Sequence, residues 1–266
     1  MIKLIAVDMD GTFLSDVKEY NRQRFDLLFD MMKTQNVEFV VASGNQYYQL
    51  RSFFHRHKEM SFVSDNGANV IHHYQDVDHE VIPWNTVHKV FDIVGGYEGV
   101  NILVCGKQSA YLTKEQTQAF YDLAINYNHR IQWVDSLENV ADDILKFALI
   151  VEPQDLEVIL EDFHRVLGDG ITPVTSGNTA IDLIQPGVHK AKGIEKIQKI
   201  LNVKDSEILA FGDNDNDIEM LKKAGIGVAV GNARPGVKDI SDVVLEKDNN
   251  SEAILDFIEA ILVAQQ

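Results

Sequence analysis

The sequence predicts an α/β fold, with a Rossmann-like parallel-sheet core and an inserted α+β cap domain. Two observations lead to this prediction. Near both ends of the chain, short apolar runs of strand length alternate with amphipathic helical segments, as expected for a parallel sheet covered by helices. In the middle, strand pairs follow one another as in an antiparallel sheet, and Pro83 and Pro186-Gly187 bracket this block. We therefore expect residues 1–83 and 186–266 to form one core domain and residues 84–185 to form the cap.

The first core part begins with a buried strand, Lys3 to Val7, that is apolar on both faces. A helix is expected over residues 20–35, because Phe25, Leu28, Phe29 and Met32 recur at helical spacing. A strand over 37–43, a helix over 45–56 and a strand over 61–68 complete this part. Strand and helix thus alternate from the start of the chain.

The cap and the second core part follow from the same patterns. In the cap we expect a hairpin over 100–113 that turns at Gly106-Lys107. It is followed by a helix (114–127), two strands (131–134 and 145–151), a helix (153–167) and a strand pair (171–176 and 179–184). The second core part is expected to hold a helix over 192–201 and a strand over 207–213. A helix over 217–225, strands over 226–231 and 242–245 and a helix over 251–263 complete the chain.

Composition narrows the class of protein. The formal net charge is −17, and an acidic chain repels nucleic-acid backbones, so no nucleic-acid partner is expected. No apolar stretch approaches the roughly 18 residues of a membrane span, and the first apolar run is too short for a signal peptide. The single cysteine, Cys105, fits a reducing compartment. We expect a cytoplasmic protein with no membrane partner; the sequence does not indicate its oligomeric state.

Polar and charged residues gather where the predicted core strands end. The first strand ends in "DMDGT" (8–12), the second in Ser43-Gly44-Asn45, and the strand near 207–211 in "GDNDND" (212–217). Taken alone, the first acids fit a turn with a helix cap, and the last run fits a solvated acidic loop or a calcium loop. Lysines stand at 190 and 192, before a predicted helix. In a parallel sheet these strand ends share one edge, where ligands bind.

Several carboxylates at one edge repel each other unless a cation lies among them. Their ligand atoms are oxygens, with no cysteine nearby, so Mg²⁺ is the expected cofactor rather than zinc. A lysine at the same edge offers complementary charge. Together the four segments predict a metal-binding site at this edge of the sheet.

These segments, in this order, resemble the four motifs of the haloacid dehalogenase superfamily. The large insert between the second and third motifs, together with "SDNGA" (64–68) and "GIGVAVGNA" (225–233), resembles the Cof-type sugar phosphatases. The resemblance extends over essentially the whole chain. It implies a Mg²⁺-dependent phosphatase that hydrolyses small phosphate esters, such as sugar phosphates, under a mobile cap.

The resemblance also implies roles for individual residues. Asp8 is the expected nucleophile, which forms an aspartyl-phosphate, and Asp10 the general acid and then the base for water. Two acids at i and i+2 of a strand end can face the same space. Thr12 is expected to help hold the phosphoryl group, and Asp213 to bind Mg²⁺ together with Asp8 and the Asp10 carbonyl. Asp217, with Asn216, completes or orients that metal shell.

A second set of residues is expected at the substrate. Ser43 donates to a phosphate oxygen, and Gly44 allows close backbone approach. Asn45 stands where many relatives carry arginine, which removes a positive contact with the substrate. Asn66 either contacts the substrate or caps a turn. Asn216 is also placed near the phosphate, and Lys146 is a further candidate on a cap strand.

The catalytic lysine depends on the register of "GVHKAKGI" (187–194). The family pattern reads G-V-x-K-G-x-G, and Gly187, Val188 and Gly193 select Lys190, with Ala191 in place of a glycine. Lys192 is the alternative. Two other functions share these motifs: transfer of the phosphoryl group to a second sugar, and a non-enzymatic phosphoacceptor switch in which phosphorylated Asp8 is a signal. The second needs neither a cap nor a second acid.

Overall fold

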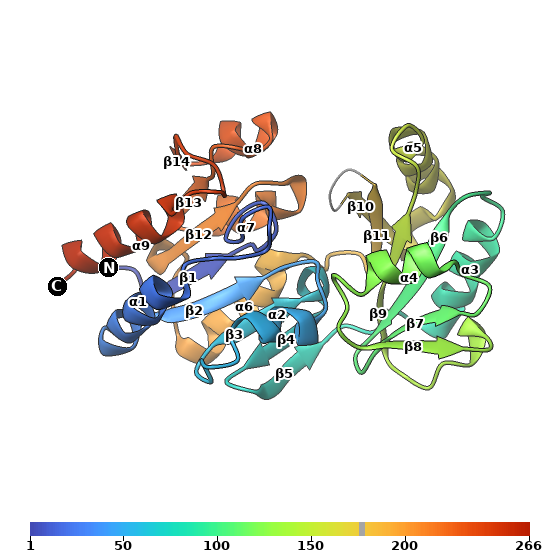
Figure 1. The fold of residues 1–266 in the computed structure, drawn as a ribbon, viewed down its shortest axis with the longest axis horizontal. Coiled ribbons are helices and arrows are strands. Elements are labelled where there is room, and N and C mark those ends of the chain that lie inside the picture. The colour runs from blue at the N-terminus through green and yellow to red at the C-terminus, as the bar shows by residue number, and fades with distance from the viewer. Residues whose placement is uncertain (176–178) are drawn as a thin grey trace.

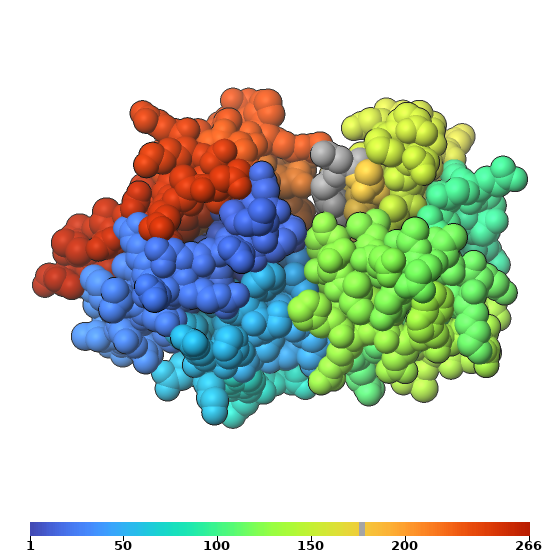
Figure 2. Space-filling view, viewed as in Figure 1, coloured from blue at the N-terminus to red at the C-terminus, as the bar shows by residue number. Residues whose placement is uncertain are grey.

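In the computed structural model, the described residues, 1–175 and 179–266, form two sheets, of eight and six strands. Figure 1 shows them side by side, with the two chain ends together at the far side of the larger sheet. The space-filling view in Figure 2 shows the same two parts in contact, the middle of the chain on one side and both ends of the chain on the other. The middle of the chain thus forms a body of its own beside the larger sheet.

The larger sheet has the strand order β14-β13-β12-β1-β2-β3-β4-β5 and is parallel from β14 to β3. Its central strand, β1, is fully buried and pairs with β12 and β2, so the two predicted acidic strand ends are neighbours. The bounds are β1 (Leu4–Val7), β2 (Glu38–Ala42), β3 (Ser61–Ser64), β4 (Asn69–His72), β5 (Gln75–His79), β12 (Ile208–Gly212), β13 (Ile226–Ala229) and β14 (Val243–Val244).

Helices cover this sheet because each buries one apolar stripe. Phe25, Leu28, Phe29 and Met32 are the buried stripe of α1, as their spacing predicts. Helix α1 packs against α9, and α6 packs against α7 (Figure 1). The bounds are α1 (Arg22–Thr34), α2 (Tyr47–Phe53), α6 (Lys190–Leu201), α7 (Ile218–Lys223), α8 (Pro235–Ile240) and α9 (Ala253–Ala264).

The smaller sheet has the order β10-β11-β9-β6-β7-β8 and is antiparallel except for the β7–β8 pair. The predicted hairpin is present: β6 and β7 pair antiparallel, and the chain turns between Gly106 and Ala110. Strand bounds are β6 (Asn101–Gly106), β7 (Ala110–Thr113), β8 (Ile131–Val134), β9 (Ile144–Ile150), β10 (Thr172–Thr175) and β11 (Ala180–Ile184); the helices are α3 (Trp84–Val94), α4 (Gln118–Ala124) and α5 (Leu156–Val166).

The structure differs from the predicted elements in several places. The strand expected over 61–68 ends at Ser64; residues 65–67 form a 3₁₀ turn, and β4 and β5 extend the sheet as an antiparallel hairpin. Helices α3 and α8 were not predicted, and the helix expected over 114–127 covers 118–124. Residue 176, the end of the strand expected over 171–176, lies outside the described residues. No helix within the described ranges is long and apolar enough to cross a membrane.

Candidate active site

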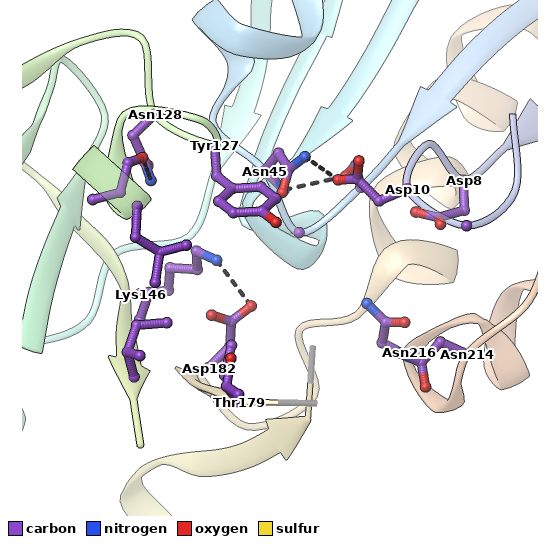
Figure 3. Close-up of a pocket in the computed structure, with 18 of the residues that line it drawn as sticks. Asp8, Asp10, Asn45, Tyr127, Asn128, Lys146, Thr179, Asp182, Asn214 and Asn216 are labelled. Carbon is purple, nitrogen blue, oxygen red and sulfur yellow. Dashed lines mark hydrogen bonds and ion pairs between the residues drawn. The ribbon is translucent and has the colours of Figure 1, made fainter. Parts of the chain in front are cut away.

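The two acids that follow β1, Asp8 and Asp10, line a cavity of about 500 Å³ between the two sheets. The core contributes the carboxylates and the loops after β2 and β12, and the smaller sheet contributes the opposite wall (Figure 3). Residues that line the cavity from the core are Asp8, Asp10, Gly11, Ser43, Gly44, Asn45, Asp213, Asn214, Asn216, Asn232 and Arg234. From the other side come Leu103, Phe120, Leu123, Ala124, Tyr127, Asn128, Lys146, Ala148, Ile150, Thr179, Ala180 and Asp182.

Lys190 is the buried cation of the site. It is the first residue of α6, its side chain is 1% exposed, and its Nζ donates to Asp8 Oδ1 at 2.5 Å and to Asp217 Oδ1 at 2.6 Å. Burial alone would lower the pKa of Lys190, but the charges of Asp217 and Asp8 raise it above its ordinary value. Lys192, by contrast, is half exposed and faces Glu195. The structure therefore brings Lys190, and not Lys192, to the predicted acids.

Asp8, Asp213 and Asp217 form a cluster whose carboxylate oxygens lie within 4.8 Å of one another. Burial raises the pKa of Asp8 well above its ordinary value, and Lys190 opposes this rise. Burial and then the charge of Asp217 raise the pKa of Asp213 to about 6. Lys190 contacts only Asp8 and Asp217 of these three acids, so the cluster fits a divalent cation that prefers oxygen ligands.

The oxygens of Asp217 are engaged by protein donors. Oδ1 accepts from Lys190, and Oδ2 accepts from the backbone N–H groups of Asp213 at 3.0 Å and Asn214 at 3.1 Å. Thr12, predicted near the phosphoryl group, is buried, and its hydroxyl donates to Asp213 Oδ1 at 2.6 Å. Thr12 and Asp217 thus hold Asp213 and its loop in place.

The glycine after Asp10 is required by this arrangement. Gly11 has φ of 79°, in the left-handed region, and a Cβ there would lie 2.7 Å from Asp213 Oδ2. Asn232 donates from Nδ2 to the Gly11 carbonyl at 2.7 Å and fixes the same loop. The motif after β1 and the loop after β12 therefore fit against each other without room for a side chain.

Asp10 lies further out than Asp8, with 27% of its side chain exposed. Its Oδ2 accepts from Asn45 Nδ2 at 2.6 Å, which Figure 3 shows as Asn45 turned towards Asp10. Its Oδ1 accepts from Lys18 Nζ. Lys18, which was not predicted, therefore places a cation beside Asp10.

The loop after β3 links the core to the smaller sheet. Asp65 and Asn66 both have positive φ, and backbone bonds tie them to the carbonyls of Asn45 at 3.1 Å and Ser43 at 3.0 Å. Asn66 donates to Asp182 Oδ2 at 2.6 Å and accepts from Asn216 Nδ2 at 3.2 Å. Asn66 thus links the core to the smaller sheet by hydrogen bonds.

Ser43, Gly44 and Asn216, the residues expected at the phosphate, all line the cavity. A Cβ on Gly44 would lie 3.1 Å from Asn66 Oδ1, so the glycine allows Asn66 to approach. Lys146 is buried on β9 and donates to Asp182 Oδ2 at 2.9 Å (Figure 3).

Four residues near the acids or lining the cavity were not predicted from the sequence: Lys18, Tyr127, Asn128 and Arg234. Lys18 stands six residues after the end of the first motif, whereas Tyr127 and Asn128 stand in no recognisable pattern.

A second cluster with metal-ligand atoms exists among the described residues, at the edge of the core: Glu38, His72 and His73. The hydroxyl oxygen of Ser61 lies 2.6 Å from Glu38 Oε1 and 2.7 Å from His72 Nδ1. These atoms therefore already have hydrogen-bond partners. The Asp8 cluster, in contrast, opens onto the cavity.

Comparison with known proteins agrees with this geometry. The family model described as haloacid dehalogenase-like hydrolase matches residues 5–258. The chain is 43% identical over 262 residues to the 5-amino-6-(5-phospho-D-ribitylamino)uracil phosphatase YbjI of Escherichia coli (strain K12), covering 98% of this chain and 96% of that protein. It is 30% identical over 248 residues to YitU of Bacillus subtilis (strain 168), a phosphatase named for the same substrate, covering 90% of each chain.

Among solved structures, SMU.1108c from Streptococcus mutans UA159 superposes with a TM-score of 0.93 at 29% identity, covering 99% of this chain and 100% of that one. The match therefore includes both sheets and the connections between them. A family model over nearly the whole chain, relatives named as phosphatases and a cavity built on two motif acids agree with one another. The chain belongs to the haloacid dehalogenase-like hydrolases and is a phosphatase, a phosphoric monoester hydrolase, of that family.

Proposed function

We propose that this phosphatase is Mg²⁺-dependent and hydrolyses 5-amino-6-(5-phospho-D-ribitylamino)uracil through an aspartyl-phosphate on Asp8. The proposed substrate rests on one observation: two relatives at 43% and 30% identity, each covered over at least 90% of its length, are named as phosphatases of this compound. The cavity supports it. Carboxylates and amides line the core wall, and the opposite wall is more apolar, with side chains such as Leu103, Phe120 and Ile150 beside Asn128, Lys146 and Asp182. A phosphate with a polyhydroxylated chain and a flat ring matches that change in polarity.

The first chemical step is assigned to Asp8 and Asp10. An Asp8 carboxylate oxygen attacks phosphorus, the ester P–O bond breaks, and the leaving oxygen takes the proton of Asp10. The exposed position of Asp10 relative to the buried Asp8 supports this division, because the proton donor has to reach the leaving group. The contact with Lys190 favours the ionised form of Asp8 in a buried site.

The second step returns the enzyme to its starting state. Asp10, now a carboxylate, takes a proton from water; the water oxygen attacks phosphorus, and the bond to Asp8 breaks. Phosphate is released, and Asp10 has regained its proton. Ser43 and Asn216 are assigned to the phosphoryl oxygens because they line the cavity beside the acids.

The metal is assigned to Asp8, Asp213 and the Asp10 carbonyl, with Asp217 as the residue that orients them. This assignment is supported by the three-acid cluster and by the donors that already occupy both oxygens of Asp217. When bound, Mg²⁺ supplies positive charge that offsets the carboxylates and polarises the phosphoryl group.

Residues 84–185 are proposed as the cap that closes over the substrate, and 1–83 with 186–266 as the core. The whole of the smaller sheet falls inside 84–185, which supports these boundaries. A closed cap excludes water and contributes the cavity wall that faces the non-phosphate part of the substrate.

The test is phosphate release by the purified protein from 5-amino-6-(5-phospho-D-ribitylamino)uracil, from ribose 5-phosphate and from p-nitrophenyl phosphate, each with Mg²⁺ and with EDTA. The proposal predicts the highest kcat/KM for the ribitylaminouracil phosphate and loss of turnover in EDTA that Mg²⁺ restores. An Asp8→Asn preparation controls for contaminating phosphatases. A higher kcat/KM for ribose 5-phosphate would show that the ring is not recognised.

A further inference from the structure

We propose that Lys18 is a positioning residue for Asp10, and that the cap residue Tyr127 completes this arrangement by lying against Lys18. The inference rests on the proposed function, because it takes Asp10 as the general acid. Lys18 and Tyr127 thereby gain a role in the chemical step. Neither residue lies in one of the sequence motifs.

The first argument is the way in which the Asp10 carboxylate is held. Lys18 Nζ donates to one oxygen and Asn45 Nδ2 donates to the other, at 2.6 Å. A carboxyl group whose two oxygens accept from groups on two different loops cannot rotate freely, and it keeps this acceptor capacity when it carries the proton of the first step. Asp10 lines the cavity with 27% of its side chain exposed, and these two donors set the direction of its carboxyl group.

The second argument is the backbone of Lys18. Its φ is 59°, a left-handed conformation that residues with a side chain rarely adopt. The turn is closed by Lys18 N–H to the Ser15 carbonyl at 2.8 Å and by Ser15 N–H to the Glu19 carbonyl at 2.9 Å. An unfavourable backbone conformation maintained by its surroundings is typical of functional positions. Here it returns the lysine side chain to the acid eight residues earlier.

The third argument is the contact with the cap. Lys18 Nζ lies 5.3 Å from the centroid of the Tyr127 ring, within the range of a cation–π interaction. Figure 3 shows this ring beside Asn45 and Asp10, on the cap side of the cavity. The ring therefore restricts the space that Lys18 can occupy while the cap covers the site.

The segment that carries Tyr127 is itself docked on the core. At the start of α2, Gln46 N–H donates to the Tyr127 carbonyl at 3.3 Å. The Gln46 side chain exchanges two hydrogen bonds, each of 2.9 Å, with the backbone of Arg130. Cap position, Tyr127, Lys18 and Asp10 thus form one continuous series of contacts. We infer that Asp10 is held most firmly when the cap is docked.

This role can be separated from direct binding of the phosphoryl group. A lysine that contacts phosphate assists every substrate equally, whatever the leaving group. A lysine that acts through the general acid matters most when the leaving group needs a proton. Phenol, with a pKa of about 10 like tyrosine, needs one more than nitrophenol does. Aryl phosphates also make the test independent of the natural substrate.

The experiment measures kcat/KM, which reports the first step, for phenyl phosphate and p-nitrophenyl phosphate. For Lys18→Met we expect a loss of roughly ten- to hundredfold on phenyl phosphate, below the roughly 10²–10⁴-fold of a complete general acid, and of less than about threefold on p-nitrophenyl phosphate. Lys18→Arg should recover most of the difference. Tyr127→Leu should give a smaller loss of the same kind, and Tyr127→Phe less still.

Two comparisons make the result decisive. Lys33→Met is the matched control, because Lys33 also pairs with an aspartate, Asp30 at 3.0 Å, and lies 5.6 Å from the Phe29 ring, but on α1. It should leave both rates unchanged. The double variant Asp10→Asn/Lys18→Met should be no slower on phenyl phosphate than Asp10→Asn, because Lys18 acts through Asp10.

Equal loss on both substrates in Lys18→Met, while Asp10→Asn does discriminate between them, would overturn the role of Lys18 alone. So would additive losses in the double variant. If Asp10→Asn itself fails to discriminate, Asp10 is not the general acid, and both the proposed mechanism and this inference are wrong.

Discussion

The Nζ of Lys190 lies 2.5 Å from Asp8 Oδ1, in surroundings that leave 1% of the lysine side chain exposed. A carboxylate buried this deeply would otherwise favour its protonated form, and burial does raise the pKa of Asp8. The lysine opposes that rise. The same contact that stabilises the buried acids therefore also favours the form of Asp8 that can attack phosphorus.

Replacing Lys190 should affect both activity and stability. Lys190→Met leaves Asp8 and Asp217 buried without their shared cation, and breaking a buried pair costs about 3–5 kcal/mol. We expect turnover of p-nitrophenyl phosphate to fall at least about a hundredfold, as for loss of other preorganised charges, together with a lower Tm. Lys192→Met, half exposed beside Glu195, is the control and should change little. The reverse ranking would show that the motif register is two residues off.

Asp8→Asn should abolish turnover while the fold is kept. The amide is a poor nucleophile of nearly the same shape, so far-UV circular dichroism and the Tm should stay close to wild type. Asp215→Asn, in the acidic loop but exposed and paired with Arg234, is the matched control and should retain activity. Turnover by Asp8→Asn above a few per cent of wild type, with contamination excluded, would remove Asp8 as the nucleophile.

Calcium should inhibit in place of magnesium. Ca²⁺ takes 6–8 oxygen ligands at longer distances than Mg²⁺, so it should bind the same carboxylates and misplace the attacking oxygen. Steady-state turnover at fixed Mg²⁺ should fall as Ca²⁺ is added, whereas both ions should raise the Tm. The Tm of Asp213→Asn should respond less to either ion. Full activity with Ca²⁺ alone would argue against the proposed geometry.

The buried Asp65 should make stability depend on pH. Burial raises the pKa of Asp65 to about 7, Lys146 opposes this, and no donor among the described residues reaches its Oδ1. The unfolded chain releases this proton near pH 4, so the native state binds more protons between about pH 4 and pH 7, and this contribution to stability is lost as pH rises through that window.

Asp65→Asn removes that titration, and asparagine readily adopts the positive φ of this position. Urea unfolding should show the variant more stable than wild type by roughly 1–3 kcal/mol near pH 8, with a smaller difference near pH 5. A constant difference between these pH values would mean that Asp65 does not titrate in this range.

The strands and site residues that could be predicted are those marked by a pattern of neighbouring residues in the chain. Buried apolar runs located the parallel strands, and the acids at 8 and 10 stand directly after one of them. The hairpin of β4 and β5 was missed because its turn uses His73 and Tyr74 at positive φ, where glycine or asparagine is the usual signal. Helix α3 buries Val87, Val90 and Val94, which recur at helical spacing. This spacing would have predicted the helix.

The site residues that the sequence did not predict act across the fold. Lys18 and Tyr127 meet because the segment after α4 docks on the start of α2 through Gln46, and this contact follows no spacing in the chain. Arg234 lines the cavity directly before helix α8, which was not predicted. Long-range packing, rather than local preference, decides these positions.

The central claim is that phosphate passes through Asp8, and the Asp10→Asn variant tests it most directly. This variant keeps the nucleophile but lacks the base for water, so the phosphorylated enzyme should accumulate. Mixed rapidly with p-nitrophenyl phosphate and Mg²⁺, it should release about one equivalent of nitrophenol per site in a burst, followed by slow turnover. Mass spectrometry of the quenched protein should find one added phosphoryl group on the peptide that contains Asp8. A burst with the phosphoryl group on another residue, or turnover with neither burst nor phosphorylated peptide, would contradict the account.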